Sequence, residues 1–367
     1  MFDKVKGKLG LGCMRLQMTD SEIDKAEFCR MIDLFIASGF NYFDTAHTYI
    51  DGKSELAIKE CIASRYARED FVLADKISYW CFEKEEEILP LFKKQLERCG
   101  VDYFDFYLFH CINHESYEKH KRCNTFEIVK KLKAEGKIKH IAMSFHDTAD
   151  FLDMVLTEQP YMEAVQLQIN YLDYDDPTVQ SKACYDVAVK HGKKVIVMEP
   201  VRGGALANLP REAEKVILKL GEGSAASHAL RFVASHPEVF MVLSGMGNVE
   251  MMQDNINTFK NFMPIKETDM GIYASAREII RKNNQIPCTK CNYCADVCPS
   301  DVPISELFSI FNELAGAKVS RDEAKGKLEK HREKLADCVK CGKCESNCPQ
   351  SIDIRERLSK IEKIIND

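Results

Sequence analysis

Eight of the 16 cysteines fall into two copies of one spacing, and this doubled run constrains the chain more than any other feature. The two copies are Cys288-x2-Cys291-x2-Cys294-x3-Cys298-Pro299 and Cys338-x2-Cys341-x2-Cys344-x3-Cys348-Pro349. A four-iron cluster must be bound at four corners, and a tight C-x-x-C-x-x-C loop supplies three thiolates. The fourth has to come from elsewhere in the chain. The spacing therefore predicts two [4Fe-4S] clusters, in a segment that cannot fold without its metal.

The C-terminal part of the chain resembles the two-cluster ferredoxins, which carry the same run. In those proteins the cysteine before proline binds the other cluster. The resemblance implies that one cluster is bound by Cys288, Cys291, Cys294 and Cys348. It implies that the second is bound by Cys338, Cys341, Cys344 and Cys298.

Zinc is the alternative, because sites of four thiolates also use C-x-x-C pairs. Such a site needs two pairs, so the third cysteine and the Cys-Pro of each run are surplus to it. A disulfide framework is disfavoured because no secretory signal precedes the opening residues. The other eight cysteines lack motif spacing, and we expect them to be buried or surface thiols in a reducing cytoplasm. They are Cys13, Cys29, Cys61, Cys81, Cys99, Cys111, Cys123 and Cys184.

Length and charge limit the remaining options. A chain of 367 residues with 45% apolar content exceeds the usual single core, which predicts two domains. No stretch approaches the roughly 20 apolar residues of a membrane span. A net charge of -6 argues against a nucleic-acid partner, because phosphate binding needs a basic face. We expect a cytoplasmic protein.

Short apolar segments alternate with longer segments of helical period before the cysteine runs. Each of eight strand candidates is followed by a helix candidate, which favours a closed (β/α)8 TIM barrel over an open doubly wound sheet. The strand candidates are Leu9–Leu16, Asn41–Asp44, Phe71–Lys76, Phe104–His110, Ile141–Ser144, Ala164–Ile169, Val195–Glu199 and Met241–Ser244. Helices are predicted over Ser21–Ser38, Lys84–Cys99 and Asp176–His191.

The pattern changes after Asn261. A helix is predicted over Glu267–Asn283, and two more, Ser305–Leu314 and Arg321–Leu335, lie between the cysteine runs. The fold class is therefore α/β, a TIM barrel with an appended, mostly α-helical two-cluster ferredoxin-like domain. We place the barrel at residues 1–262 and the cluster domain at 263–367.

Reactive side chains of such a barrel lie at the C-terminal ends of its strands. The second strand ends in Asp44, the third in Lys76 and the fourth in His110. Residues 44–55 match D-T-A-x-x-Y-x-x-G-x-S-E, the signature of the aldo-keto reductases, which the chain resembles over roughly residues 8 to 260. The resemblance implies a catalytic tetrad of Asp44, Tyr49, Lys76 and His110.

The tetrad suits the reduction of a carbonyl, which needs hydride at carbon and a proton at oxygen. A phenol with a pKa near 10 is a poor donor at neutral pH. An ammonium about 4 Å away, at an effective dielectric near 20, favours the phenolate by about 4 kcal/mol. We therefore expect Lys76 to lower the pKa of Tyr49 by roughly three. Asp44 would hold Lys76 in place, and His110 would orient the substrate oxygen. Taken singly, each residue has a structural explanation; their order on the strand ends favours catalysis.

The family resemblance also implies an extended nicotinamide dinucleotide across the barrel mouth. Ser144 and Gln166 match the residues that hold the carboxamide. Glycines after the seventh and eighth strands would let backbone N–H groups approach the phosphates. These phosphate and adenine candidates are Gly203, Gly204, Ser244, Gly245, Asn248, Asp254 and Asn255.

Three departures from the family pattern leave the cofactor open. Phe145 replaces the amide that usually follows Ser144, and Met198 replaces the aromatic that stacks on nicotinamide. Met251 stands where many relatives carry an arginine for the 2'-phosphate. NADPH, NADH and FMN all remain candidates.

Three functions compete at this stage. The first is an NAD(P)H-dependent carbonyl reductase or alcohol dehydrogenase of a low-oxygen cell, acting on a small molecule. The second is a flavin-containing, ferredoxin-linked oxidoreductase with an electron-transfer partner protein, because hydride moves two electrons and a cubane cluster passes one. The third is a non-enzymatic electron-carrying or interaction subunit. The intact tetrad favours the first.

Overall fold

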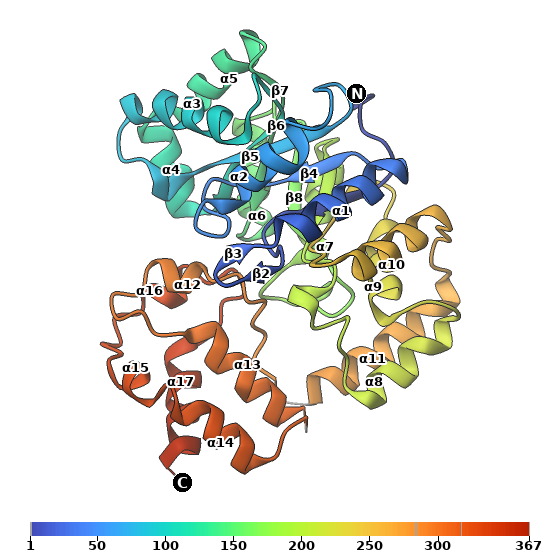
Figure 1. The fold of residues 1–367 in the computed structure, drawn as a ribbon, viewed down its shortest axis with the longest axis vertical. Coiled ribbons are helices and arrows are strands. Elements are labelled where there is room, and N and C mark those ends of the chain that lie inside the picture. Colours follow the sequence, from blue (N-terminus) through green and yellow to red (C-terminus); the bar gives the residue numbers. More distant parts are fainter. Residues whose placement is uncertain (1, 283–284, 317, 367) are drawn as a thin grey trace. The chain divides into compact units, whose positions relative to one another are not determined.

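The computed structural model describes residues 2–282, 285–316 and 318–366 (Figure 1). The chain forms two compact units. The barrel unit comprises Met1–Pro200 and Ala226–Ile265, and the helical unit comprises Val201–Ala225 and Lys266–Asp367. The helical unit thus includes a segment from the middle of the sequence. The domain limits 1–262 and 263–367 remain predictions.

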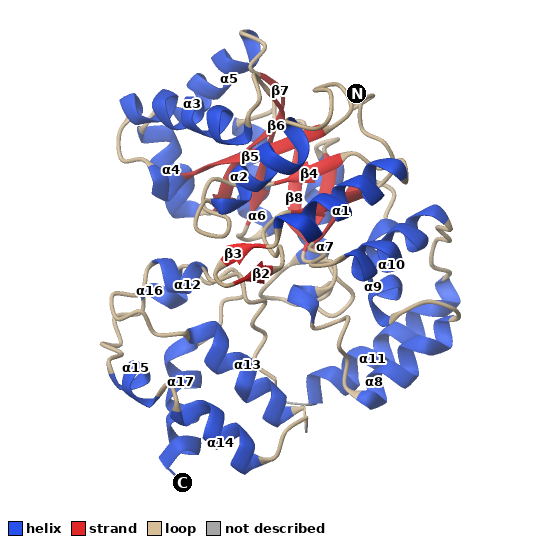
Figure 2. Cartoon of the chain, in the orientation of Figure 1, coloured by secondary structure: helices blue, strands red, loops and turns tan. Residues whose placement is uncertain are grey.

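Eight parallel strands close into a barrel, so the predicted fold class is confirmed (Figure 2). The strands are β1 (Leu9–Gly12), β4 (Tyr42–Asp44), β5 (Val72–Ser78), β6 (Phe104–Ile112), β7 (Ile138–Phe145), β8 (Ala164–Gln168), β9 (Lys194–Met198) and β10 (Val239–Ser244). They follow one another around the barrel, and β1 pairs with both β4 and β10. Such strands are covered on both faces, which explains their continuous apolar runs.

Helices follow the strands in the barrel unit. They are α1 (Lys25–Ala37), α2 (Lys53–Ile58), α3 (Ile88–Cys99), α4 (His114–Arg122), α5 (Thr125–Ala134), α6 (Ala149–Glu158), α7 (Ser181–Lys190), α9 (Ala225–Ala234) and α10 (Val249–Lys260). Short turns of π- and 3-10 helix accompany them: η1 (Lys59–Ala63), η2 (Tyr79–Cys81) and η3 (Glu85–Glu87). Among the described residues, no helix combines the length and the apolar character needed to cross a membrane.

The predicted helices begin too early. Ser21 lies in the turn of a hairpin formed by β2 (Met18–Thr19) and β3 (Glu22–Ile23), and has a φ of 66°. The helix therefore starts only at Lys25, where the Asp24 side chain accepts a hydrogen bond from the Glu27 backbone N–H. A hairpin this short leaves little periodicity in the sequence to reveal it.

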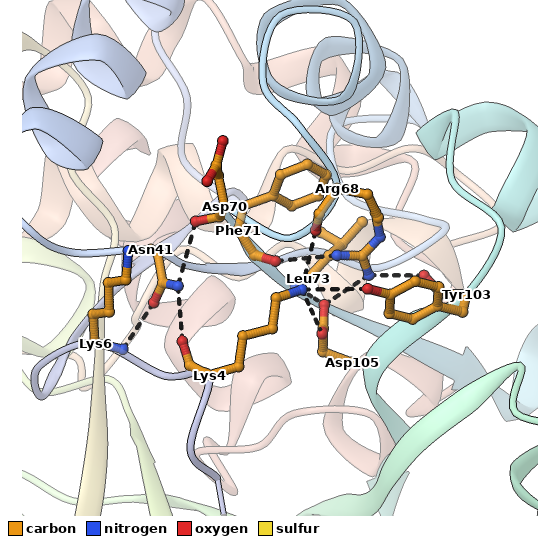
Figure 3. Close-up of polar contacts among 9 residues, drawn as sticks. All are labelled: Lys4, Lys6, Asn41, Arg68, Asp70, Phe71, Leu73, Tyr103 and Asp105. Carbon is orange, nitrogen blue, oxygen red and sulfur yellow. Dashed lines mark hydrogen bonds and ion pairs between the residues drawn. The ribbon is translucent and has the colours of Figure 1, made fainter.

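The N-terminal segment packs against the barrel at the N-terminal ends of its strands. Lys4 Nζ donates to Asp105 Oδ1 at 3.0 Å, and Arg68 pairs with Asp105 Oδ2 at 2.7 Å (Figure 3). The same carboxylate accepts from the Leu73 backbone N–H at 2.9 Å. Nearby, Phe2 packs against Phe106 with ring centroids 5.1 Å apart. We call Lys4, Arg68 and Asp105 the barrel plug.

The helical unit is built from short helices around its own core. They are η4 (Arg202–Gly204), α8 (Arg211–Ile217), η5 (Leu218–Leu220), η6 (Glu267–Asp269), α11 (Met270–Lys282), α12 (Tyr293–Asp296), α13 (Ile304–Ala315), α14 (Arg321–Glu329), α15 (Arg332–Ala336), α16 (Lys343–Ser346) and α17 (Ile354–Asn366). The predicted helix over Arg321–Leu335 is two helices, interrupted at Lys330–His331. Of the predicted helix over Glu267–Asn283, Asn283 lies outside the described residues. The core includes Leu307, Phe308, Leu328, Leu358 and Ile361.

Candidate functional site

Four polar residues meet at the C-terminal ends of neighbouring strands. Asp44 ends β4, Lys76 lies in β5, His110 lies in β6, and Tyr49 lies in the loop before α2. Because β4, β5 and β6 are adjacent and parallel, their C-terminal ends lie at the same end of the barrel. All four residues are buried. The structure thus brings together the four residues that the sequence singles out.

Direct contacts link the four side chains. Lys76 Nζ donates to Asp44 Oδ1 at 2.6 Å and to the Thr45 carbonyl at 2.7 Å. The same nitrogen lies 4.7 Å from the centre of the Tyr49 ring. The Tyr49 and His110 rings meet edge to face, with centroids 5.9 Å apart. A cation, a phenol and an imidazole are therefore held within contact distance of one another.

The loop that carries Tyr49 is fixed by other residues of the signature. Thr45 Oγ1 and Ser54 Oγ are 2.7 Å apart, and Ser54 Oγ donates to the Cys13 carbonyl at 2.9 Å. Gly52, with a φ of 78°, begins α2. The fully buried Glu55 carboxylate accepts from Arg98. The loop that carries Tyr49 is thus held in place by four other residues of the signature, Thr45, Gly52, Ser54 and Glu55.

The expected lowering of the Tyr49 pKa is wrong. Burial raises the pKa of Tyr49 to about 12, and the Lys76 ammonium only partly opposes that rise. Desolvation of the phenolate costs more free energy than its attraction to the Lys76 ammonium provides. Asp44 also neutralises much of the lysine charge. Tyr49 therefore holds its proton at neutral pH, which is the state that a proton donor requires.

Lys76 and His110 have opposite protonation states. Burial alone would lower the pKa of Lys76, but the Asp44 carboxylate and Tyr49 raise it above its ordinary value, so the ammonium stays charged. Burial and then the Lys76 charge hold the pKa of His110 well below its usual range. The His110 ring is therefore neutral, and its Nδ1 lies 2.7 Å from Ser78 Oγ. In the tautomer that carries its hydrogen on Nε2, His110 accepts from Ser78 at Nδ1 and can donate from Nε2.

Several residues around this group were missed by sequence reasoning. Trp80, in η2, lies with its ring centroid 4.9 Å from that of His110. Burial lowers the pKa of His146, just after β7, to about 4. Behind Lys76, the buried groups of Glu55, Asp75 and Cys99 lie within 4.8 Å of one another. Burial and Glu55 raise the pKa of Asp75 well above its usual range. Of these residues, only Trp80 could have been found from the sequence, because the aromatic pair Tyr79-Trp80 directly follows a strand.

Ser144 and Gln166 stand side by side on β7 and β8. Ser144 Oγ accepts a hydrogen bond from the Cys111 backbone N–H at 2.8 Å. Gln166 Oε1 is buried and has no hydrogen-bond partner among the described residues. A buried carbonyl oxygen without a donor is costly, and a ligand amide would satisfy it. The pair therefore fits the carboxamide of a nicotinamide.

The candidates after β10 are partly used within the protein. Ser244 Oγ accepts from Asn255 Nδ2 at 2.7 Å, and Asn248 caps α10 by accepting from the Met251 backbone N–H. A β carbon at Gly245 would lie 3.4 Å from Arg15 Cδ. Arg15 in turn pairs with Glu199 at 2.6 Å, a contact that the sequence did not predict. Asp254 lies in α10 beside Asn255.

Gly203 and Gly204 belong to the helical unit, in η4. Their φ values are 60° and 90°, which favour glycine. A β carbon at Gly203 would lie 2.3 Å from the carbonyl oxygen of Thr289, the residue after Cys288. The turn therefore packs against the backbone of the first cysteine run. This contact could not be predicted from sequence pattern, because 86 positions separate the two residues.

The eight cysteines of the two runs line two separate pockets of the helical unit. The first pocket is lined by Cys288, Cys291, Cys294 and Cys348. The second is lined by Cys298, Cys338, Cys341 and Cys344. Each pocket takes three cysteines from one run and the cysteine before proline from the other. None of these eight cysteines is disulfide-bonded to another described residue.

The spacing of these thiols bears on the metal. A tetrahedral zinc with Zn–S bonds of about 2.3 Å places its sulfurs about 3.8 Å apart. Among the described residues, three donor atoms come within 4.8 Å of one another only in the Glu55, Asp75 and Cys99 group. Each pocket offers four thiolates, the number that a four-iron cluster needs at its corners.

Two further cysteines correct the sequence analysis. Cys29 of α1 and Cys61 of η1 form a disulfide, with Cα atoms 5.0 Å apart. The expectation that both are free thiols is wrong. Packing of α1 against η1 brings them together, and a separation of 32 residues carries no local signal. The other six cysteines outside the runs are free, as expected.

Comparisons with known proteins match both units. The family model "Aldo/keto reductase family" matches residues 8–278, and "4Fe-4S dicluster domain" matches residues 287–352. The "Uncharacterized oxidoreductase YqkF" of Bacillus subtilis is 25% identical over 281 residues, covering 68% of this chain and 86% of the relative. The "Glyoxal reductase" of the same organism is 26% identical over 203 residues, covering 55% of this chain and 67% of the relative.

Solved structures share the barrel fold. The holo form of aldo-keto reductase AKR11C1 from Bacillus halodurans has a TM-score of 0.62 at 22% identity, over 73% of this chain and 91% of that one. An aldo-keto reductase from Klebsiella pneumoniae in complex with NADPH has a TM-score of 0.57 at 20% identity, over 74% of this chain and 90% of that one.

Proposed function

Since the chain belongs to the aldo/keto reductase family and carries a 4Fe-4S dicluster domain, we propose that it reduces an aldehyde or ketone to an alcohol, or catalyses the reverse. The hydride would come from a nicotinamide cofactor. One observation carries this proposal: a charged Lys76, a protonated Tyr49 and a neutral His110 converge in a buried site. A purely structural ion pair would not require the phenol or the imidazole.

Tyr49 is the proton donor in this proposal. When bound, the nicotinamide supplies hydride to the carbonyl carbon. Negative charge then develops on the carbonyl oxygen, and the Tyr49 hydroxyl gives it a proton. An alkoxide, with the pKa of water at about 15.7 as a guide, is more basic than a phenolate whose pKa is about 12, so this transfer is downhill.

Lys76 and His110 stabilise the charges on either side of that transfer. The Lys76 ammonium, 4.7 Å from the Tyr49 ring centre, stabilises the phenolate once the proton has left. Asp44 keeps the ammonium in position through its 2.6 Å contact. His110 donates from Nε2 to the substrate oxygen, because its Nδ1 is engaged by Ser78. The imidazole orients the substrate rather than giving up the proton.

The same proposal assigns the cofactor residues. Gln166 and Ser144 would hold the carboxamide, supported by the unsatisfied Gln166 Oε1. Ser244, Gly245 and Asn248 would lie near the phosphates, and Asp254 with Asn255 near the adenine. Met251 is 54% exposed and offers no charge to a 2'-phosphate. We therefore propose that NADH serves at least as well as NADPH.

For the helical unit we infer two [4Fe-4S] clusters. The first would be bound by Cys288, Cys291, Cys294 and Cys348, and the second by Cys298, Cys338, Cys341 and Cys344. Support comes from two pockets lined by these two sets and from the match of residues 287–352 to a 4Fe-4S dicluster domain. Protein purified without oxygen should contain about eight irons per chain, four for each cluster. Stoichiometric zinc without brown absorbance would contradict the assignment.

The test of the catalytic proposal is Tyr49→Phe. This variant should lower the rate of carbonyl reduction by roughly 10²- to 10⁴-fold, because it removes the proton donor and little else. The measurement is NADH oxidation with a panel of aldehydes and ketones under anaerobic conditions. Tyr66→Phe is the matched control, since Tyr66 bonds Asp33 at the outside of the barrel unit. Near-normal turnover in Tyr49→Phe, with normal iron content, would rule out the assignment.

A flavin at the barrel mouth is the second candidate. Met198 in place of a stacking aromatic, and Phe145 in place of an amide, favour it over a nicotinamide. The absorption spectrum of anaerobically purified protein separates the two. A flavin band that bleaches together with the cluster absorbance on adding NADH supports a ferredoxin-linked enzyme. A spectrum that NADH leaves unchanged supports the nicotinamide-dependent reductase.

A further inference from the structure

The two cysteine loops of the helical unit repeat one backbone conformation. Lys290 and Lys340 occupy the same position of their loops, two residues after the first cysteine, with φ values of 57° and 54°. Two positions further on, Asn292 and Gly342 have φ values of 64° and 80°. The loops can therefore be compared position by position, and any difference between them lies in their side chains and surroundings.

The surroundings of the two loops differ at the residue after the first cysteine. In the first loop this residue is Thr289, which is 2% exposed and packs against the turn at Gly203. In the second loop it is Val339, which is 66% exposed. No other large apolar side chain among the described residues is exposed to that extent. At this position the first loop is covered by its own unit, whereas the second loop exposes an apolar side chain.

The cysteines follow the same asymmetry. Cys294 of the first pocket is buried, whereas its counterpart Cys344 is half-buried. Cys291 is half-buried, whereas its counterpart Cys341 is exposed. Electron transfer between proteins is favoured where a redox centre comes close to the surface. The second pocket is the one that offers such a route.

Charge around Val339 indicates the kind of partner. Lys340 and Lys343 are exposed on either side of Cys341, and neither has an acidic partner among the described residues. Arg355, which also lines the pocket, is already neutralised by Glu345 at 2.6 Å. In the first loop the position of Lys343 is taken by the uncharged Tyr293. An exposed apolar side chain followed in the same loop by two exposed lysines without acidic partners, in a chain of net charge -6, favours an acidic partner.

We propose that Val339, Lys340, Cys341 and Lys343 form the docking site for an acidic one-electron carrier protein. The proposal rests on the two clusters inferred above. The carrier would lose one electron, and the iron–sulfur centre of the second pocket would gain it; no proton moves and no bond is made. The first pocket is then the inner centre, and it exchanges electrons with the outside only through the second.

The probe is an acidic two-cluster ferredoxin, reduced with dithionite and freed of excess reductant. Stopped-flow absorbance under anaerobic conditions measures its oxidation by the holoprotein, and calorimetry measures its dissociation constant. Lys340→Glu/Lys343→Glu should lower the bimolecular rate constant about tenfold or more at low salt and weaken binding in parallel. The loss should shrink as salt rises, because screening removes the attraction.

The repeat supplies a matched control. Lys290→Glu makes the same charge change as Lys340→Glu alone, at the same backbone position of the first loop. It should leave rate and affinity within twofold of the parent protein, whereas Lys340→Glu alone should lower both. An equal or larger effect of Lys290→Glu would overturn the proposal, as would normal rates in Lys340→Glu/Lys343→Glu. A shift of oligomeric state in that double variant, without a change in ferredoxin binding, would assign the surface to a second copy of the chain and also overturn it.

Iron content and carbonyl reduction driven by NADH keep this test separate from the proposed function. Both should be unchanged in the loop variants, because none of the three lysines lies in the barrel unit. Transfer from ferredoxin to the clusters needs no carbonyl substrate. A failed Tyr49→Phe test would therefore leave the docking result standing, and a failed docking test would leave the reductase proposal standing.

Discussion

Individual side chains in the barrel owe their chemistry to burial more than to their neighbours. Tyr49 illustrates this, because a lysine at contact distance does not overcome the loss of water around the phenol. The sequence places Asp44, Lys76 and His110 on strand ends and so predicts that they meet. It does not reveal how completely they are buried. The meeting of the tetrad was therefore predictable, and the pKa of its tyrosine was not.

His120 shows the same effect away from the candidate active site. Both ring nitrogens are buried without a hydrogen-bond partner among the described residues, and the ring lies 5.2 Å from Phe109 and 5.7 Å from Phe82. Burial lowers the pKa of His120 to about 3. In the unfolded chain His120 therefore binds a proton as pH falls below about 6.5, whereas in the folded protein it stays neutral until pH falls toward 3. Stability is full above pH 6.5 and is lost as pH falls toward 3.

We predict that His120→Phe flattens this acid dependence. At pH 5 the parent protein loses about 2 kcal/mol through His120, since each pH unit below 6.5 costs about 1.36 kcal/mol. The difference in free energy of unfolding between variant and parent should therefore be about 2 kcal/mol more favourable to the variant at pH 5 than at pH 7.5. The phenylalanines around position 120 should accommodate the new ring. Urea unfolding at both pH values measures the difference. An identical pH slope in parent and variant would show that His120 is protonated in the folded state.

The helices and strands could be predicted from the sequence wherever the pattern of apolar residues matches the limits of the element. All eight barrel strands were predicted, because each contains a short apolar run between polar turns. Helix ends were less predictable. The turn before α7 and the hairpin before α1 read as helix, because helical spacing of apolar residues continues through them. The division into α14 and α15 was hidden in the same way.

The barrel plug is an element-level feature whose energy can be measured. Asp105 receives hydrogen bonds from Lys4, Arg68 and the Leu73 backbone N–H. Asp105→Asn should destabilise the protein by about 1–3 kcal/mol, because two cations lose their counterion while remaining partly open to water. Carbonyl reduction should be retained, since the N-terminal face of such a barrel serves stability.

Urea unfolding measures this change, with Asp70→Asn as the control. Asp70 is exposed in the same region, and the hydrogen bond recorded for it uses its backbone carbonyl (Figure 3). Equal stabilities of the two variants would mean that the plug contributes nothing. Loss of activity in Asp105→Asn at full stability would place part of the function at this end of the barrel.

On the scale of the whole molecule, the helical unit draws on two distant parts of the sequence. Residues 201–225 join the cluster-bearing residues that follow position 265. The sequence located the cysteine runs and the helices around them, because their spacing is regular. It could not reveal that the turn at Gly203 packs on Thr289, since contacts between remote segments leave no periodic trace.

We predict that Gly203→Ala loosens the first cysteine pocket. The new methyl group would meet the Thr289 carbonyl at 2.3 Å, and an L residue is strained at a φ of 60°. Iron should be lost from the variant to a chelator several-fold faster than from the parent protein, followed by the decay of cluster absorbance. Gly204→Ala shares the positive φ but meets no atom within 4 Å, so it controls for strain alone. Equal iron loss in the two variants would exclude the Thr289 contact as the cause.

The exchange of one cysteine between the two runs has a consequence for biosynthesis. Cys348 completes the first pocket, and Cys298 completes the second. Neither pocket can close until the ribosome has translated both runs, and by then the whole barrel has been made. Under the proposed cluster assignment, iron can be bound only after the whole barrel has been translated, and a chain interrupted between the runs would hold neither cluster.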